Sequence, residues 1–179
     1  MPVRPIKFRH GVRVMLVAGP EVLLINDSDP GIPGSSWWVI PGGGIDDGES
    51  PLEAACREVF EETGLQLEAS QLIGPVGSGI VVHGYSDRIR VQAEVFHRAE
   101  VPRFTPDFSR WTPWEKQRMC GAAWHRNDSL PANCWPGHLP ELLAATPSQP
   151  LSCALREEST VPLTRAEWQQ VSDAVPGDA

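Results

Sequence analysis

The sequence has few of the features that mark secreted, membrane or zinc-binding proteins. Its four cysteines, among 179 residues, form no CxxC pair and no His-paired zinc spacing. No apolar run reaches about 18 residues, and no charged-then-apolar leader is present. These absences predict a cytoplasmic protein with reduced thiols and no membrane partner. The cysteines are Cys56, Cys120, Cys134 and Cys153.

Positive charge is also scarce. Asp and Glu outnumber Lys and Arg by 23 to 15, which gives a formal net charge of −8. This balance argues against a general surface for a nucleic-acid polymer. The length favours one domain with a sizeable core. A small phosphorylated substrate that arrives with its metal ions fits this composition.

The most informative part of the chain is the segment 43–65, with the sequence GGIDDGESPLEAACREVFEETGL. Ser50 and Glu53 predict a capping box at a helix start, with Pro51 at the first helical position. Gly64 predicts the helix end, where a left-handed conformation is needed. The helix brings three carboxylates to one face at spacing i, i+3 and i+4. They are Glu58, Glu61 and Glu62.

The three carboxylates indicate a metal site. Like charges on one helix face repel each other by ~0.2–0.5 kcal/mol per pair. A hard cation such as Mg²⁺ removes this repulsion and also accepts phosphate oxygens. The alternative is a solvated acidic face partly neutralised by Arg57, four residues before Glu61. The glycines at 42–44 follow a predicted strand, 37–40, and allow the backbone to approach a ligand closely.

Taken together, the fixed positions resemble the signature of the Nudix hydrolase family (MutT-like). That signature is a glycine, five residues, a glutamate, seven residues, then Arg-Glu-apolar-x-Glu-Glu-x-Gly-apolar. Every fixed position is filled, from Gly43 and Glu49 through Arg57 to Gly64. The resemblance implies an α/β fold, a Nudix α/β/α sandwich with a mixed β-sheet between helices. We expect this domain in residues 1–146, with a C-terminal extension, 147–179, that carries a short helix docked on the same domain.

The resemblance also implies a cofactor and roles for individual residues. Mg²⁺ or Mn²⁺ is the expected cofactor. Glu58, Glu61 and Glu62 would bind it, together with the carbonyl of Gly42. Arg57 and Glu49 would form an ion pair that orients the loop against the helix. Glu53 also stands four residues before Arg57 and is an alternative partner for it.

The reaction implied is attack of water on a diphosphate bond in a nucleoside diphosphate linked to another group. Divalent ions neutralise the phosphate charge and activate water, while a carboxylate accepts the proton. The candidate bases are Glu58, Glu94, Glu100 and Glu115. A nucleotide pyrophosphohydrolase is the favoured reading. The alternatives are a non-catalytic nucleotide-binding module and an enzyme similar to isopentenyl-diphosphate isomerase, both disfavoured by the intact signature.

Substrate specificity is less well determined. Trp111, Trp114 and Arg110 lie in a basic, aromatic segment, 104–118, suited to stacking a base and pairing a phosphate. Trp37 and Trp38 are equally plausible stacking partners. The alternative for these tryptophans is core packing. The residue patterns of ADP-ribose and dinucleoside polyphosphate enzymes are not in register here, and a homodimer is left open.

Periodicity and turn residues predict the remaining elements. A hairpin is expected from the runs 11–18 and 21–26, joined by Gly19 and Pro20. Thr164 and Glu167 predict a second capping box at the start of a C-terminal helix, with Leu163 and Trp168 as a hydrophobic staple. Further strands are expected at 67–73, 88–97 and 120–125, and a helix at 138–145.

Overall fold

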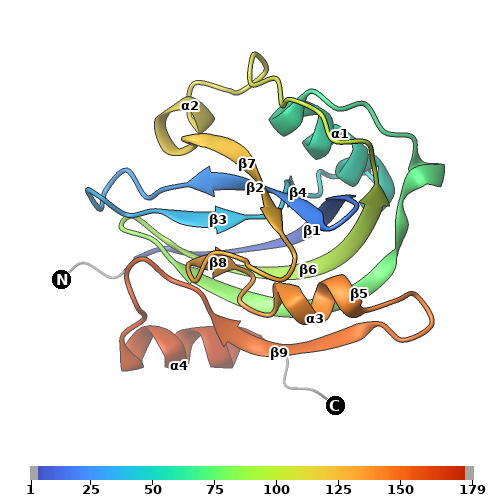
Figure 1. Cartoon of the computed structure of the whole chain (residues 1–179). Helices are drawn as coiled ribbons and strands as arrows, with labels where there is room; N and C mark the ends of the chain where they lie inside the picture. The colour runs from blue at the N-terminus through green and yellow to red at the C-terminus, as the bar shows by residue number, and fades with distance from the viewer. Residues whose placement is uncertain (1–3, 176–179) are drawn as a thin grey trace.

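Alternating apolar residues make β1 (Ile6–Ala18) the centre of the fold in this computed structural model, which describes residues 4–175. Successive side chains of a strand point to opposite faces. Val12 and Val14 therefore pack under α1 (Pro51–Thr63), whereas Met15 and Val17 pack under α3 (Leu139–Ala144). The two helices cover opposite faces of a curled sheet (Figure 1).

The sheet is mixed and follows the order β8-β3-β2-β1-β6-β5-β9, with β4 paired to β1 and β7 paired to β2. β1 runs parallel to β6 and antiparallel to β2. The predicted α/β sandwich with a mixed sheet is confirmed. The other elements are β2 (Glu21–Asp27), β3 (Trp37–Val39), β4 (Gly42–Gly44), η1 (Ala69–Gln71), β5 (Ile73–Gly84), β6 (Ile89–Glu100), α2 (Glu115–Arg118), β7 (Gly121–Arg126), β8 (Cys134–Trp135), β9 (Leu151–Glu157) and α4 (Arg165–Ala174).

Local sequence signals set the ends of the main helix. The Ser50 side chain accepts from the Glu53 amide, and the Glu53 carboxylate accepts from the Ser50 amide, so the predicted capping box is present. Gly64 ends the helix with φ of 75°, a conformation that favours glycine. No helix in residues 4–175 is long and apolar enough to cross a membrane.

The strand predicted at 67–73 is wrong. The structure has the short helix η1 there, and β5 begins at Ile73 and continues to Gly84. Glycines weaken the strand pattern of β5, yet Gly77 is required for packing. A Cβ on Gly77 would lie 2.7 Å from the Leu142 side chain of α3.

The C-terminal residues continue the sheet. β9, which periodicity did not predict, pairs in parallel with β5. α4 begins at the predicted Thr164–Glu167 capping box and packs Val171 against the β5–β6 end of the sheet. Arg4 binds Glu167 at 2.9 Å, which ties the start of the described chain to α4. The extension therefore lies against the same sheet as α1.

Truncation of Leu142 to alanine should lower the free energy of unfolding by ~2–5 kcal/mol, because the side chain is fully buried between α3 and the sheet. Chemical denaturation measures this change. Leu155→Ala is the matched control, since Leu155 is 45% exposed and its loss should cost no more than ~0.5 kcal/mol. Equal losses in the two variants would contradict the assigned packing of α3.

Candidate active site

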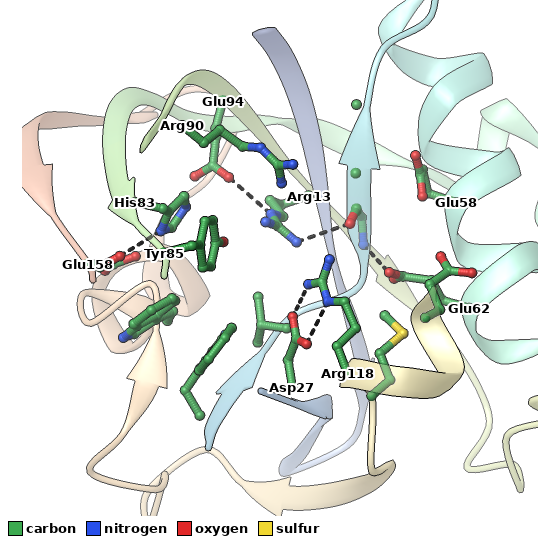
Figure 2. Close-up of a pocket in the computed structure, with 18 of the residues that line it drawn as sticks. Arg13, Asp27, Glu58, Glu62, His83, Tyr85, Arg90, Glu94, Arg118 and Glu158 are labelled. Atoms are coloured by element: carbon green, nitrogen blue, oxygen red, sulfur yellow. Dashed lines mark hydrogen bonds and ion pairs between the residues drawn. The ribbon is translucent and has the colours of Figure 1, made fainter. Parts of the chain in front are cut away.

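A cavity of about 230 Å³ opens where α1, the glycine strand β4 and the inner strands meet. Glu58 and Glu62, one helical turn apart on α1, both line it. Glu61 does not, because its side chain is 45% exposed and its carboxylate lies 3.3 Å from Arg57. Two of the three predicted carboxylates are thus brought together in the cavity (Figure 2).

The glycines of β4 allow α1 to approach the backbone directly. The Gly42 amide donates to a Glu62 carboxylate oxygen at 2.9 Å. Gly42 has φ of 139°, and a Cβ there would lie 2.1 Å from the carbonyl oxygen of Val12. On Gly43, a Cβ would lie 2.3 Å from the Glu58 carboxylate. Any larger residue at these two positions would force the carboxylates or the backbone to move.

Arg57 joins the loop to the helix as the sequence predicts. Its guanidinium binds the Glu49 carboxylate through two hydrogen bonds of 2.8 Å and donates to the Gly44 carbonyl at 2.9 Å. The alternative partner, Glu53, is occupied by the helix cap instead. Arg57 also contacts Glu58 at 3.0 Å, so one cation fixes both the loop and part of the acidic face.

The positive charges near Glu58 and Glu62 do not fully compensate the burial of their carboxylates. Burial, together with repulsion from Glu58, raises the pKa of Glu62 to about 8. Burial also raises the pKa of Glu58, although Arg57 opposes the shift. A cation beside both groups would relieve this cost, so the pair suits a divalent metal. In residues 4–175 no cluster of three or more His, Cys, Asp or Glu side chains is arranged around one point. A metal here would take its remaining ligands from solvent or substrate.

The carbonyl of Gly42, predicted as a further metal ligand, has another partner. Arg13 donates to it at 3.0 Å, to the Ile40 carbonyl at 3.3 Å and to Glu94 at 3.0 Å. A guanidinium therefore stands where the prediction places a cation. The structure supports Glu58 and Glu62 as ligands more directly than it supports Gly42.

Next to the acidic end, the cavity is rich in arginine. Burial and repulsion from Arg90 and Arg13 lower the pKa of Arg9 to about 9, and burial lowers the pKa of Arg90. Arg118 is held by an ion pair with Asp27. Of these cavity arginines, the sequence pointed only to Arg118, which lies in the basic segment 104–118. The available signal was the alternation of β1, which places Arg9 and Arg13 on the same face as the buried Met15.

Only two of the five predicted substrate-binding residues line the cavity. Trp37 stacks on Trp135 with ring centroids 4.4 Å apart, and Trp114 stands at the rim, 44% exposed. Trp38 is the next residue of β3 after Trp37, so it points to the other face and packs on His125.

The other two predictions also fall outside the cavity lining. Trp111 is buried and donates its indole N–H to the main-chain carbonyl of Glu62 at 3.0 Å, so it supports α1. Arg110 lies over the Phe60 ring, with its guanidinium carbon 4.1 Å from the centroid. These residues and Trp38 make the packing contacts that the alternative interpretation expects.

Three of the four candidate bases line the cavity: Glu58, Glu94 and Glu115. Glu100 does not, and it pairs with Arg98. Burial tends to raise the pKa of Glu94, but its neighbours, Arg13 first among them, outweigh this effect. The pKa of Glu94 is therefore below its ordinary value. None of the four cysteines lines the cavity.

Comparison with known proteins defines the class. A family model described as NUDIX domain matches residues 7–145, so the chain belongs to the NUDIX domain family, as predicted. It is 41% identical over 73 residues to an RNA pyrophosphohydrolase of Rhizobium meliloti, covering 37% of this chain and 42% of that protein. It is 66% identical over 29 residues to one of Bartonella quintana, covering 16% and 17%. The chain thus spans less than half the length of these curated relatives.

Solved structures share the fold. A C. elegans Ap4A hydrolase binary complex superposes with a TM-score of 0.52 at 18% identity, covering 76% of this chain and 93% of that chain. The E. coli ORF135 protein gives a TM-score of 0.51 at 21% identity, covering 78% and 89%. At these identities the similarity concerns the fold alone.

The raised pKa of Glu62 makes stability depend on pH. Its folded value of about 8 lies above the ordinary 4.5, so the associated stability is complete below the ordinary value and is lost as pH rises through about 8. Metal-free Glu62→Gln should therefore unfold at a higher temperature than the parent near pH 9 and at the same temperature near pH 5. Mg²⁺ should reverse the order at pH 9, because it binds the parent more tightly than the variant and so stabilises it more.

Glu61→Gln is the control for this measurement, because the Glu61 carboxylate is 45% exposed. Without Mg²⁺, its unfolding temperature should follow that of the parent across the same pH range. If Glu61→Gln and Glu62→Gln gave identical pH profiles, the assigned burial of Glu62 would be wrong.

Proposed function

We propose that this protein is a divalent-metal-dependent hydrolase that splits a diphosphate bond in a nucleotide, with water as the nucleophile. One observation carries the proposal. The same cavity is lined by Glu58 and Glu62, whose pKa values are raised, and by Arg9 and Arg90, whose pKa values are lowered. A metal ion would compensate the charge of the carboxylates, and phosphate oxygens would compensate the charge of the arginines. A metal–diphosphate complex supplies both kinds of charge at once.

Each group then has a defined task. Glu62 and Glu58 would hold Mg²⁺ or Mn²⁺. Glu61, whose carboxylate lies 3.3 Å from Arg57 and outside the cavity lining, would complete the set by leaving that contact. A bound divalent cation neutralises phosphate charge and stabilises the leaving oxygen. The half-buried guanidinium of Arg9 and the neighbouring arginines of the cavity orient the phosphates. The candidate bases that line the cavity are Glu58, Glu94 and Glu115, and Glu94 and Glu115 stay available when Glu58 binds the metal.

The substrate is proposed as a nucleoside triphosphate or a related diphosphate derivative. The similarity to proteins named RNA pyrophosphohydrolase suggests a second candidate substrate, a 5′-triphosphorylated RNA end, which contains the same diphosphate bond. A substrate panel separates the two. The sequence predicts a cytoplasmic location and no polymer substrate, and both remain predictions. A homodimer stays open.

Glu62→Gln should lower kcat in saturating Mg²⁺ by more than ~100-fold, beyond the 10–100-fold typical of residues that only support a metal ligand. The release of pyrophosphate or phosphate from a panel of nucleoside triphosphates and a triphosphorylated RNA oligonucleotide measures the rate. Glu141→Gln on α3, outside the cavity, should retain the parent rate. Undiminished turnover by Glu62→Gln would refute the metal assignment.

A further inference from the structure

The cavity is divided by charge along its length. Glu58 and Glu62 lie at the α1 side, and His83 and Glu158 lie at the opposite side, with Arg13 between them (Figure 2). Glu158 directly follows β9 and lies outside the matched family region, 7–145. The C-terminal extension therefore contributes an acidic side chain to the cavity that the family signature does not contain.

Glu158 is held rigidly by its main chain. Its amide donates to the Val82 carbonyl at 2.9 Å. Its carbonyl is 2.8 Å from Nδ1 of His83. Burial lowers the pKa of His83 to about 4, so the ring is neutral and Nδ1–H donates this bond. Both neighbouring residues of β5 thus fix where the Glu158 side chain begins.

The two oxygens of the Glu158 carboxylate have different surroundings. Oε1 accepts from the Gly137 amide at 2.8 Å and from Nε of Arg156 at 3.0 Å. Oε2 accepts no hydrogen bond from any side chain or main-chain group in residues 4–175. The side chain is only 10% exposed and lines the cavity. An acceptor with one free oxygen in such a place has room for a donor from a ligand.

The chemistry of this end favours a base over a phosphate, although Arg156 beside Glu158 carries a positive charge. A carboxylate repels phosphate oxygens, which the arginines attract instead. Beside it, Trp135 stacks on Trp37 at 4.4 Å and on His83 at 5.3 Å, which provides a flat apolar surface. A nucleobase combines a flat ring with N–H groups at its edge.

We propose that Glu158 is a specificity-determining residue whose Oε2 accepts a hydrogen bond from the exocyclic amino group of a purine base. This inference rests on the proposed function, because it assumes that the phosphates bind at the α1 side. The extension would then determine which nucleotide is hydrolysed, while α1 supplies the groups that act on the diphosphate.

Glu158→Gln tests the inference sharply. Gly137 and Arg156 both present donors to Oε1, so the amide oxygen must occupy that position and the amide NH₂ must face the cavity. The acceptor becomes a donor with little change in shape. The preference should move from amino to oxo purines, so the kcat/KM ratios ATP/ITP and GTP/XTP are the quantities to measure.

The pair to compare is the one whose amino purine the parent hydrolyses faster. For that pair, we expect the kcat/KM ratio of amino to oxo purine to fall by about 10-fold or more in Glu158→Gln. The assay is run at pH 8, because burial raises the pKa of Glu158 and the ionised form is the acceptor. Glu157→Gln is the matched control: it removes the same charge from β9, but Glu157 binds Trp168 and does not line the cavity. Its ratios should equal those of the parent, and thermal unfolding checks that both variants fold.

Unchanged ratios in Glu158→Gln would overturn the inference while leaving the hydrolase proposal intact. A change confined to the ratio of ribo- to 2′-deoxyribonucleotides would also overturn it, since Glu158 would then contact the sugar. Quenching of tryptophan fluorescence by the same nucleotides gives binding ratios that do not need turnover. If no nucleotide is hydrolysed but these ratios still invert, the proposed function fails and the base contact stands.

Discussion

The hydrogen bond from the Gly42 amide to the Glu62 carboxylate, 2.9 Å long, is the contact on which the site depends. It exists only because β4 consists of glycines, which let α1 lie against the strand with no side chain between them. Arg57 then joins the intervening loop to the same helix through Glu49. A short segment of chain thus carries both the acids and the parts that hold them.

The cost of this arrangement is that charged side chains of both signs are concentrated in one cavity. Carboxylates on α1 and arginines on β1 and β6 approach the same cavity, yet Glu62 and Arg9 are not neutralised by each other. Their pKa values shift in opposite directions, each towards the uncharged form. This imbalance favours a ligand that carries both signs of charge, as a metal–nucleotide complex does.

The C-terminal extension adds both a strand to the sheet and a side chain to the cavity. β9 lengthens the sheet beyond β5, and the turn after it places Glu158 at the far side of the cavity. Thr160, in the same turn, binds Asp29 at 2.7 Å, and Asp29 also binds Ser86. The extension is therefore tied to loops around the cavity as well as to the sheet.

The sequence by itself determined the features that depend on neighbouring residues. The caps and length of α1 and the meeting of Glu58 with a glycine turn lie within residues 42–64, where spacing along a helix fixes geometry. The structure then showed that Arg57 pairs with Glu49, while Glu53 is occupied by the helix cap. The family followed from the same segment. Tryptophans in a basic segment were weaker guides, because Trp111 proved to support α1 rather than line the cavity.

Tertiary structure decided which distant residues share the cavity. Arg13 meets Glu94 because β1 and β6 pair in parallel, and Glu158 reaches His83 because β9 pairs with β5. The sequence contains no mark of either pairing, since strand partners are chosen by burial of whole faces and not by the residues that meet at one point. The acids could be found from local spacing, whereas the arginines and Glu158 required the sheet.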